Sequence, residues 1–148
     1  MQIQDLMVKN VIVVSPTAGI SEVARLLAEK RFHGLPVVEN GKVIGIITET
    51  DFFTKDPPGL YLPSYIDILK KTKFKMGIGR EQKKKFKELF NLQAKDIMSS
   101  PCQTILDTMP VRQAFDFFKN THFITLPVIN VKGELVGIIT VSDILKLL

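Results

Sequence analysis

The sequence predicts an α/β fold (α+β in some classifications) built from two copies of one strand–helix–strand–strand–helix unit. Residues 5–53 match residues 96–148 at an offset of 91, which becomes 92 once the second copy gains a residue in a turn. Both copies close with glycine, two apolar residues, threonine, two variable residues and aspartate, at 45–51 and 137–143. Hydrophobic periodicity alternates between strand and helix in both. Because a unit of about 50 residues buries little surface alone, we expect the copies to pack sheet to sheet about a pseudo-twofold axis and to share one core.

Each element of the first copy has its own signal. We expect a strand over 11–14, a helix over 20–30 and two further strands over 35–38 and 43–47. The helix shows the i, i+3, i+4, i+7 spacing of one buried face, at Ile20, Val23, Ala24 and Leu27. The Asn40-Gly41 pair favours the positive φ angles of a tight hairpin between the last two strands.

The second copy repeats this order. We expect a strand over 103–105, a helix after Pro110 and a hairpin turn at Lys132-Gly133. The buried helix face is predicted from Val111, Ala114, Phe115 and Phe118. A short helix should follow each closing aspartate.

The chain divides into a first repeat at 1–55, an insertion at 56–94 and a second repeat at 95–148, with the two repeats forming one module. The insertion is expected to contain helices over 64–73 and 80–92. Residues 54–95 carry eleven Lys or Arg and four Asp or Glu, a net charge of +7, whereas the rest of the chain carries −2. The basic character of the protein therefore belongs to one segment.

This basic segment is open to three interpretations. It is a solvated helix face, a nucleic-acid contact, since Phe74 and Phe86 lie among the lysines, or a basic amphipathic helix at a membrane surface. We favour the first, because charge runs usually mark solvated surface and no helix-turn-helix or aromatic sheet pattern accompanies the charge.

The amino-acid composition also limits the functions that the protein can have. Cys102 is the only cysteine, so an internal disulfide and a thiolate zinc site are excluded. The two histidines, His33 and His122, stand beside no visible nucleophile. No apolar run reaches the ~20 residues that cross a bilayer, and the start of the chain lacks a secretory signal, so we expect a cytoplasmic protein. The sequence contains no catalytic constellation, and we expect no enzyme activity.

The two closing turns carry the functional signal. Thr48 and Thr140 fall where a strand turns into a helix, a position that exposes backbone N–H groups to phosphate. Asp51 and Asp143, three residues later, are acceptors suited to a ribose diol. The same pattern also fits a helix N-cap followed by an acid at the third helical position, which needs no ligand. Its occurrence in both repeats favours a ligand role.

The duplicated order, the closing pattern and the Leu-Pro-Val strand at 35–37 and 126–128 resemble the cystathionine-β-synthase (CBS) domain pair, or Bateman module. The resemblance covers residues 5–53 and 96–148. It implies a module that binds an adenosine-containing ligand, namely AMP, ADP, ATP or S-adenosylmethionine, in two clefts between the repeats.

The resemblance also implies a role for particular residues. Asp51 and Asp143 match the family's ribose-binding aspartate, and Thr48 and Thr140 match the hydroxyl near the phosphates. The base is expected against the first strand of each repeat, at Val13, Val14, Thr104 and Ile105. His33 and Gly34 would serve the Asp143 cleft, and Ile124 and Thr125 the Asp51 cleft. With a histidine on its side, the Asp143 cleft is expected to be the better nucleotide site.

The sequence thus predicts a stand-alone regulatory module that signals by a change of conformation or of dimer geometry. The apolar closing helices, at Phe52-Phe53 and 144–148, favour a homodimer, and the regulated protein target is not identified by the sequence. The alternative is an interaction protein with empty clefts, whose basic insertion docks a protein partner or nucleic acid.

Overall fold

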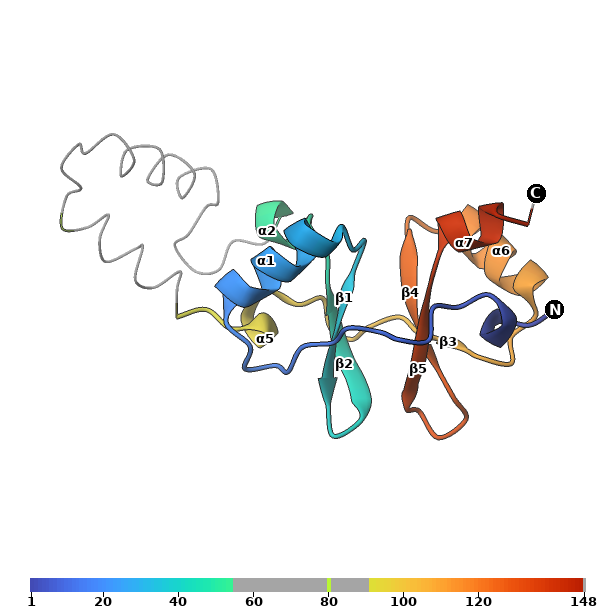
Figure 1. Cartoon of the computed structure of the whole chain (residues 1–148), viewed down its shortest axis with the longest axis horizontal. Coiled ribbons are helices and arrows are strands. Elements are labelled where there is room, and N and C mark those ends of the chain that lie inside the picture. Colours follow the sequence, from blue (N-terminus) through green and yellow to red (C-terminus); the bar gives the residue numbers. More distant parts are fainter. Residues whose placement is uncertain (55–79, 81–90, 148) are drawn as a thin grey trace.

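The computed structural model describes residues 1–54, residue 80 and residues 91–147, and it confirms the α/β architecture (Figure 1). The first part contains η1 (Ile3–Asp5), α1 (Ile20–Lys30), β1 (Leu35–Glu39), β2 (Lys42–Ile47) and α2 (Asp51–Thr54). The second contains α5 (Ala94–Ile97), β3 (Ile105–Leu106), α6 (Val111–Asn120), β4 (Thr125–Ile129), β5 (Leu135–Thr140) and α7 (Val141–Leu145). The two predicted helices of the insertion lie outside the described residues, apart from Arg80 and positions 91 and 92.

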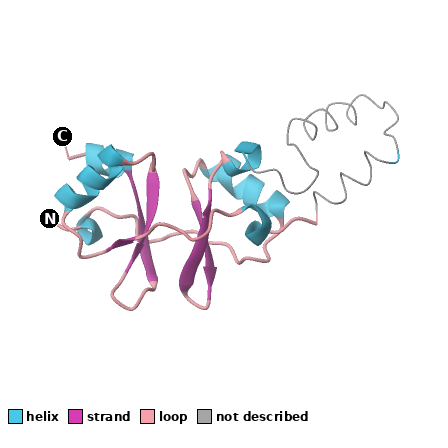
Figure 2. Cartoon of the chain, turned by 180° about the vertical axis from the view of Figure 1, so that it is seen from behind, coloured by secondary structure: helices cyan, strands magenta, loops and turns pink. Residues whose placement is uncertain are grey.

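Two small sheets lie next to each other in the middle of the molecule, with the helices on the outside (Figure 1, Figure 2). In one, β1 pairs with β2 in antiparallel fashion; in the other, β4 pairs with β3 in parallel and with β5 in antiparallel fashion. The hairpins meet where Lys42 bridges Glu134. The predicted arrangement of the repeats is therefore confirmed.

The helix and turn predictions that fall on described residues are confirmed, except for one residue of the buried face of α6. Helix α1 spans the predicted residues, and Asn40 (φ 52°), Gly41 (φ 78°) and Gly133 (φ 79°) take the expected positive φ angles. Phe115 of α6 was expected in the core but is 45% exposed, because Ala114 and Phe118 occupy the buried face of that helix.

The opening strands are shorter than the sequence predicts. The strand expected over 11–14 is reduced to Val14, which makes an isolated parallel bridge to Val37, and Ile12 and Val13 are 40% and 41% exposed. Strand β3 begins at Ile105 rather than at residue 103. An apolar run forms a strand only where a neighbour supplies hydrogen bonds, and β1 supplies them at Val14 alone.

The expectation of one shared core is wrong, because each repeat has its own core and the repeats exchange their opening segments. Ile3 of η1 is buried in the second core, with Ile105 and Leu126, whereas Ile97 of α5 is buried in the first core, with Leu35. Backbone hydrogen bonds fix both exchanged segments. Ile3 N–H donates to the Met109 carbonyl at 3.0 Å, and Ala94 N–H donates to the Ala18 carbonyl at 2.8 Å. Neither core is complete without residues from the other repeat.

The exchange explains the glycine of the closing pattern. Each opening segment runs across the second strand of the other repeat's hairpin. Ser99 exchanges backbone hydrogen bonds with Ile46 (3.2 and 2.9 Å), and Val8 exchanges them with Ile138 (2.9 and 3.0 Å). A Cβ on Gly45 would lie 2.5 Å from Met98 Sδ, and one on Gly137 would collide with Met7 Sδ. Only a residue without a side chain leaves room for these methionines.

Replacement of Gly137 by alanine should therefore destabilise the protein by about 1–3 kcal/mol, since the added methyl group overpacks a closed contact. Chemical denaturation measures this change in the free energy of unfolding. The double variant Gly137→Ala with Met7→Ala should be less destabilised than the sum of the single variants. Gly19→Ala is the control, because no heavy atom beyond the chain neighbours lies within 4 Å of its Cβ position. Equal losses at Gly19 and Gly137 would contradict the packing explanation.

The exchanged segment also predicts that Ile3, near the start of the chain, matters as much as a central residue. Ile3 is 0% exposed, and Ile3→Ala should cost about 2–5 kcal/mol through lost burial and the cavity left behind. Gln4→Ala, at the exposed neighbouring position, should change the free energy of unfolding much less. If the denaturation midpoint of the Ile3→Ala variant equals that of the wild type, η1 does not complete the second core.

Candidate functional site

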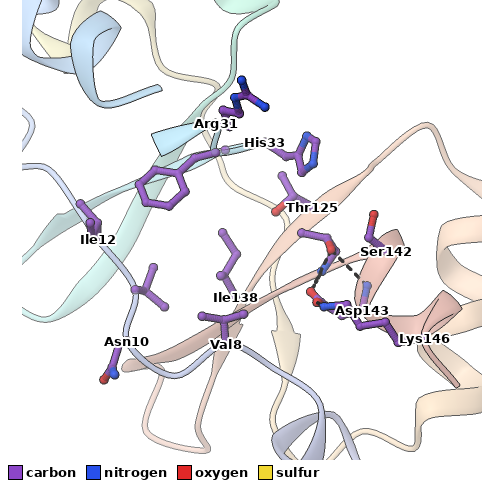
Figure 3. Close-up of a pocket in the computed structure, with 14 residues that line it drawn as sticks. Val8, Asn10, Ile12, Arg31, His33, Thr125, Ile138, Ser142, Asp143 and Lys146 are labelled. Atoms are coloured by element: carbon purple, nitrogen blue, oxygen red, sulfur yellow. Dashed lines mark hydrogen bonds and ion pairs between the residues drawn. The ribbon is translucent and has the colours of Figure 1, made fainter. Parts of the chain in front are cut away.

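Two cavities lie between the repeats, and each contains one of the closing aspartates. The first, here called the Asp143 cavity, has a volume of about 290 Å³ (Figure 3). It is lined by Val8, Asn10, Val11, Ile12, Arg31, Phe32, His33, Gly34, Thr125, Ile138, Thr140, Ser142, Asp143 and Lys146. The second, the Asp51 cavity, has a volume of about 480 Å³ and is lined by His33, Ile46, Thr48, Glu49, Thr50, Asp51, Ser99, His122, Phe123, Ile124 and Thr125. Both linings combine residues of the two repeats.

In the Asp143 cavity, the carboxylate is held from two sides. The backbone N–H of Thr140 and its hydroxyl donate to Asp143 Oδ2 at 2.9 and 2.8 Å. The other oxygen, Oδ1, accepts a hydrogen bond from Lys146 Nζ at 2.9 Å. The Asp143 side chain is 9% exposed, whereas that of Lys146 is 74% exposed. One oxygen is thus fixed by the turn, and the other is held by a side chain that can move into solvent.

The charge of Asp143 follows from these contacts. Burial opposes the ionised form, but the hydrogen bonds from Lys146 and Thr140 and the nearby ammonium charge outweigh burial. The pKa of Asp143 is therefore lower than its ordinary value. At neutral pH the cavity contains a carboxylate that can only accept hydrogen bonds.

In the Asp51 cavity, the second oxygen has a different partner. The backbone N–H and the hydroxyl of Thr48 donate to Asp51 Oδ2 at 2.7 and 3.2 Å. Ser99, from the other repeat, donates through its hydroxyl to Asp51 Oδ1 at 3.1 Å. The duplication matches Ser99 with Val8, a side chain that cannot donate a hydrogen bond. This difference leaves Lys146 as the donor to the equivalent oxygen of Asp143.

The hydrogen bonds of both turns are those of a helix cap, as the second interpretation of the pattern predicts. Thr140 caps α7 through a hydrogen bond from Asp143 N–H at 3.3 Å, and both aspartates bond back to the threonine amide. Helix α7 contains five residues and ends with Lys146 as its C-cap, so the helix dipole at the Asp143 turn is short. Phosphate binding would have to rely on charged side chains instead.

The residues that precede each Leu-Pro-Val strand reach the cavities. His33 and Gly34 line the Asp143 cavity, and Ile124 and Thr125 line the Asp51 cavity. His33 and Thr125 line both. The Thr125 hydroxyl is buried without a hydrogen-bond partner, and Figure 3 shows it turned toward the middle of the Asp143 cavity. It is an unused polar group in the wall between the two cavities.

Four residues expected at the base are not among those that line the cavities. Val14 and Ile105 pack in the first and second cores, Val13 is 41% exposed, and Thr104 is half-buried. The opening segment instead reaches the Asp143 cavity through Val11 and Ile12. The opening strand and the expected base-binding residues thus differ from prediction for the same reason, because only Val14 of the segment 11–14 pairs with the sheet.

Several lining residues were not predicted from the sequence. Arg31 and Lys146 supply the positive charge of the Asp143 cavity, and the Asp51 cavity contains Glu49 and His122. His33, expected to serve the Asp143 cleft, also lines the Asp51 cavity, together with His122. The internal offset of 91 places Arg31 opposite His122, a signal that could have found both.

Three further features of the described residues are the cysteine, possible metal ligands and possible membrane spans. Burial raises the pKa of the Cys102 thiol to about 11, which makes it a poor nucleophile. Among the described residues, no cluster of His, Cys, Asp or Glu side chains could hold a metal ion. The helices described here also include none with the length and apolar character of a membrane span.

Comparison with known proteins agrees with this geometry. A family model for the CBS domain matches residues 3–56 and 94–148. The uncharacterized protein MJ1426 of Methanocaldococcus jannaschii is 29% identical over 157 residues, which cover 100% of this chain and 91% of that protein. MJ1225 of the same organism is 27% identical over 144 residues, or 97% of this chain, but the chain spans only 46% of its length.

Solved structures share the fold. The crystal structure of Arabidopsis thaliana CBSX2 in complex with AMP superposes with a TM-score of 0.70 at 22% identity, covering 99% of this chain and 94% of that one. The CBS domain pair of MJ0100, crystallised with 5′-methylthioadenosine and S-adenosyl-L-methionine, gives a TM-score of 0.67 at 22% identity, with coverage of 99% and 94%. At this identity the likeness concerns the fold. With the family model matched twice and over more than half of the chain, this protein belongs to the CBS domain family, as a tandem pair.

Proposed function

We propose that this protein is a regulatory module that binds an adenosine-containing ligand, either an adenine nucleotide (AMP, ADP or ATP) or S-adenosylmethionine, and that the Asp143 cavity is its main site. The observation that carries this proposal is the Asp143 carboxylate, which is buried and ionised, with its Oδ1 atom bonded to an exposed lysine. A ribose diol could take the place of Lys146 at that oxygen. The freed ammonium group would then be available to a phosphate.

The rest of the Asp143 cavity supports the same ligand. Arg31 lies on the opposite side of the cavity from Lys146 (Figure 3), and a guanidinium group binds phosphate through two parallel hydrogen bonds. Val11, Ile12 and Ile138 supply apolar surface for a base. Relatives crystallised with AMP or with S-adenosylmethionine support the adenosine part of the proposal.

Regulation requires more than binding, because a ligand shifts a conformational equilibrium only if it prefers one state. The cavities lie between repeats that exchange segments, so a ligand contacts both halves of the module at once. We propose that ligand binding changes the position of one repeat relative to the other, and that this change is the signal. Capture of proteins from a lysate with and without ligand would identify the protein target.

Asp143→Asn should weaken adenine-nucleotide binding at least tenfold by isothermal titration calorimetry, since the ribose loses a charged acceptor. The wild type should melt at a higher temperature with ligand, by the equivalent of roughly 2.7 kcal/mol at ~100 times the dissociation constant. Asp116→Asn is the matched control, on the exposed face of α6. Because Asp143 also caps α7, the melting curve of each variant without ligand must first show that it is folded.

Unchanged affinity in Asp143→Asn would refute the assignment of this cavity. If AMP, ATP and S-adenosylmethionine all leave the wild-type melting temperature unchanged, while heparin or DNA retains the protein in a salt-sensitive way, the module is an interaction protein with empty clefts.

We also propose that two chains form a homodimer through α6 and α7. A groove of about 260 Å³ between these helices is lined by Phe115, Phe118, Lys119, Val141, Ile144 and Leu145. Leu145 and Leu147 are 52% and 44% exposed, although Ile144 is buried in the second core. A twofold axis would place each leucine of one chain against the groove of the other.

Leu145→Lys should convert the dimer to a monomer, because it places a charge in the apolar contact. Light scattering coupled to size-exclusion chromatography at micromolar concentration measures the mass. Val131→Lys, at a hairpin position that is 83% exposed, should leave the mass unchanged. A monomeric mass for the wild type would refute the dimer.

A further inference from the structure

Strands β1 and β4 begin at matched positions of the two repeats, and the residues at these positions lie against each other. The internal offset of 91 pairs Gly34, immediately before β1, with Thr125, the first residue of β4. A Cβ atom built on Gly34 would lie 2.7 Å from Thr125 Cγ2. A twofold rotation exchanges matched positions, so a contact between the two lies on the pseudo-twofold axis that relates the repeats.

Only one of these two positions has room for a side chain. Gly34 is buried, and Thr125 is 4% exposed. A separation of 2.7 Å is well below the ~3.5–4.0 Å at which two carbon atoms attract each other. The φ angle of Gly34 is not positive, so space rather than backbone conformation excludes a side chain there. The unequal pair of glycine and threonine is therefore a packing requirement of the axis.

The Thr125 methyl group is the neighbour that cannot move away. The next nearest atom to the built Cβ, Ile46 Cδ1 at 2.9 Å, is the end of a flexible and half-buried side chain. The third, Ile46 Cγ1, lies at an ordinary contact distance of 3.4 Å. A threonine side chain, by contrast, is branched at Cβ and stiff at χ1. A larger residue at position 34 would therefore push β4 away from β1.

The contact also lies close to both closing turns. The first turn follows β2, which pairs with β1, and Thr125 itself pairs with Thr140 of the second turn. Gly34 lines the Asp143 cavity, and Thr125 lines both cavities. A change in the separation of β1 and β4 would therefore move the two turns relative to each other and reshape both cavities.

We infer that Gly34 and Thr125 form a spacer on the pseudo-twofold axis, which sets the separation of the two repeats and thereby the shape of both cavities. Both are positioning residues, because they act through the turns that carry the aspartates. The spacer itself depends only on these contacts. Its consequence for ligand binding rests on the proposed function.

Amide hydrogen exchange measured by NMR tests the spacer without a ligand. Gly34→Ala should make exchange about tenfold faster at the hydrogen bonds between the repeats, because overpacking weakens their contact. These bonds join Ile46 to Ser99 and Val8 to Ile138. The internal reference is the Val38 amide, which donates to the Val14 carbonyl within the first repeat and should change much less.

Two further variants separate spacing from a general effect of alanine. Gly19→Ala is the matched control, because no heavy atom beyond the chain neighbours lies within 4 Å of its Cβ position, and its exchange rates should be those of the wild type. Thr125→Ser removes the obstructing methyl group and keeps the hydroxyl. In the double variant Gly34→Ala with Thr125→Ser, exchange between the repeats should return to within about threefold of the wild type.

Calorimetry with AMP should follow the exchange rates. Gly34→Ala should bind AMP about tenfold more weakly, since the site is no longer ordered in its binding geometry, and the double variant should recover this affinity. A Gly34→Ala variant that binds AMP weakly with wild-type exchange between the repeats would overturn the spacer, because the added methyl group then only fills the Asp143 cavity.

Failure of Thr125→Ser to rescue Gly34→Ala would also overturn the spacer. If Gly34→Ala does not fold but the double variant does, the spacer is supported; if neither folds, the Thr125 methyl group is not the obstacle and the inference fails. A wild type that binds neither AMP nor S-adenosylmethionine, with exchange rates that follow the expected pattern, would count against the proposed function and leave the spacer standing.

Discussion

The structure depends on the exchange of opening segments between the two repeats. η1 completes the second core and α5 completes the first, and on the way each segment passes a methionine over a glycine of the opposite hairpin. A repeat of about 50 residues gains too little from its own burial, and the exchange adds apolar surface from its neighbour. The same contact fixes the two repeats relative to each other. This packing therefore determines the shape of the cavities between the repeats.

In the closing turn of each repeat, the two oxygens of one aspartate have different partners. In the second repeat, Oδ2 of Asp143 accepts hydrogen bonds from the threonine amide and hydroxyl at the start of the short helix, while Oδ1 has a donor of its own in Lys146. Capping and ligand binding are therefore not rival explanations of the pattern. A carboxylate oriented by the turn is already in place when a ligand arrives, which lowers the cost of ordering the site.

The wall between the cavities is shared. His33 and Thr125 line both cavities. Coupling between two sites requires an element that both ligands bias, and under the proposed function these two residues would be the first place to look for it. The duplication thus supplies two cavities that have residues in common.

The sequence by itself determined the repeat, the order of the elements, the hairpin turns at Asn40-Gly41 and Lys132-Gly133, and the two Thr-Asp turns, because periodicity and turn chemistry are local properties. Only the tertiary structure decided that the opening segments are exchanged, that the first strand shrinks to Val14, and that Arg31, His122 and Lys146 face the cavities. Those outcomes depend on contacts between residues distant in the chain, such as Met7 with Gly137. A local pattern cannot encode which distant partner a segment will find, since the choice is made by the packing of the whole chain.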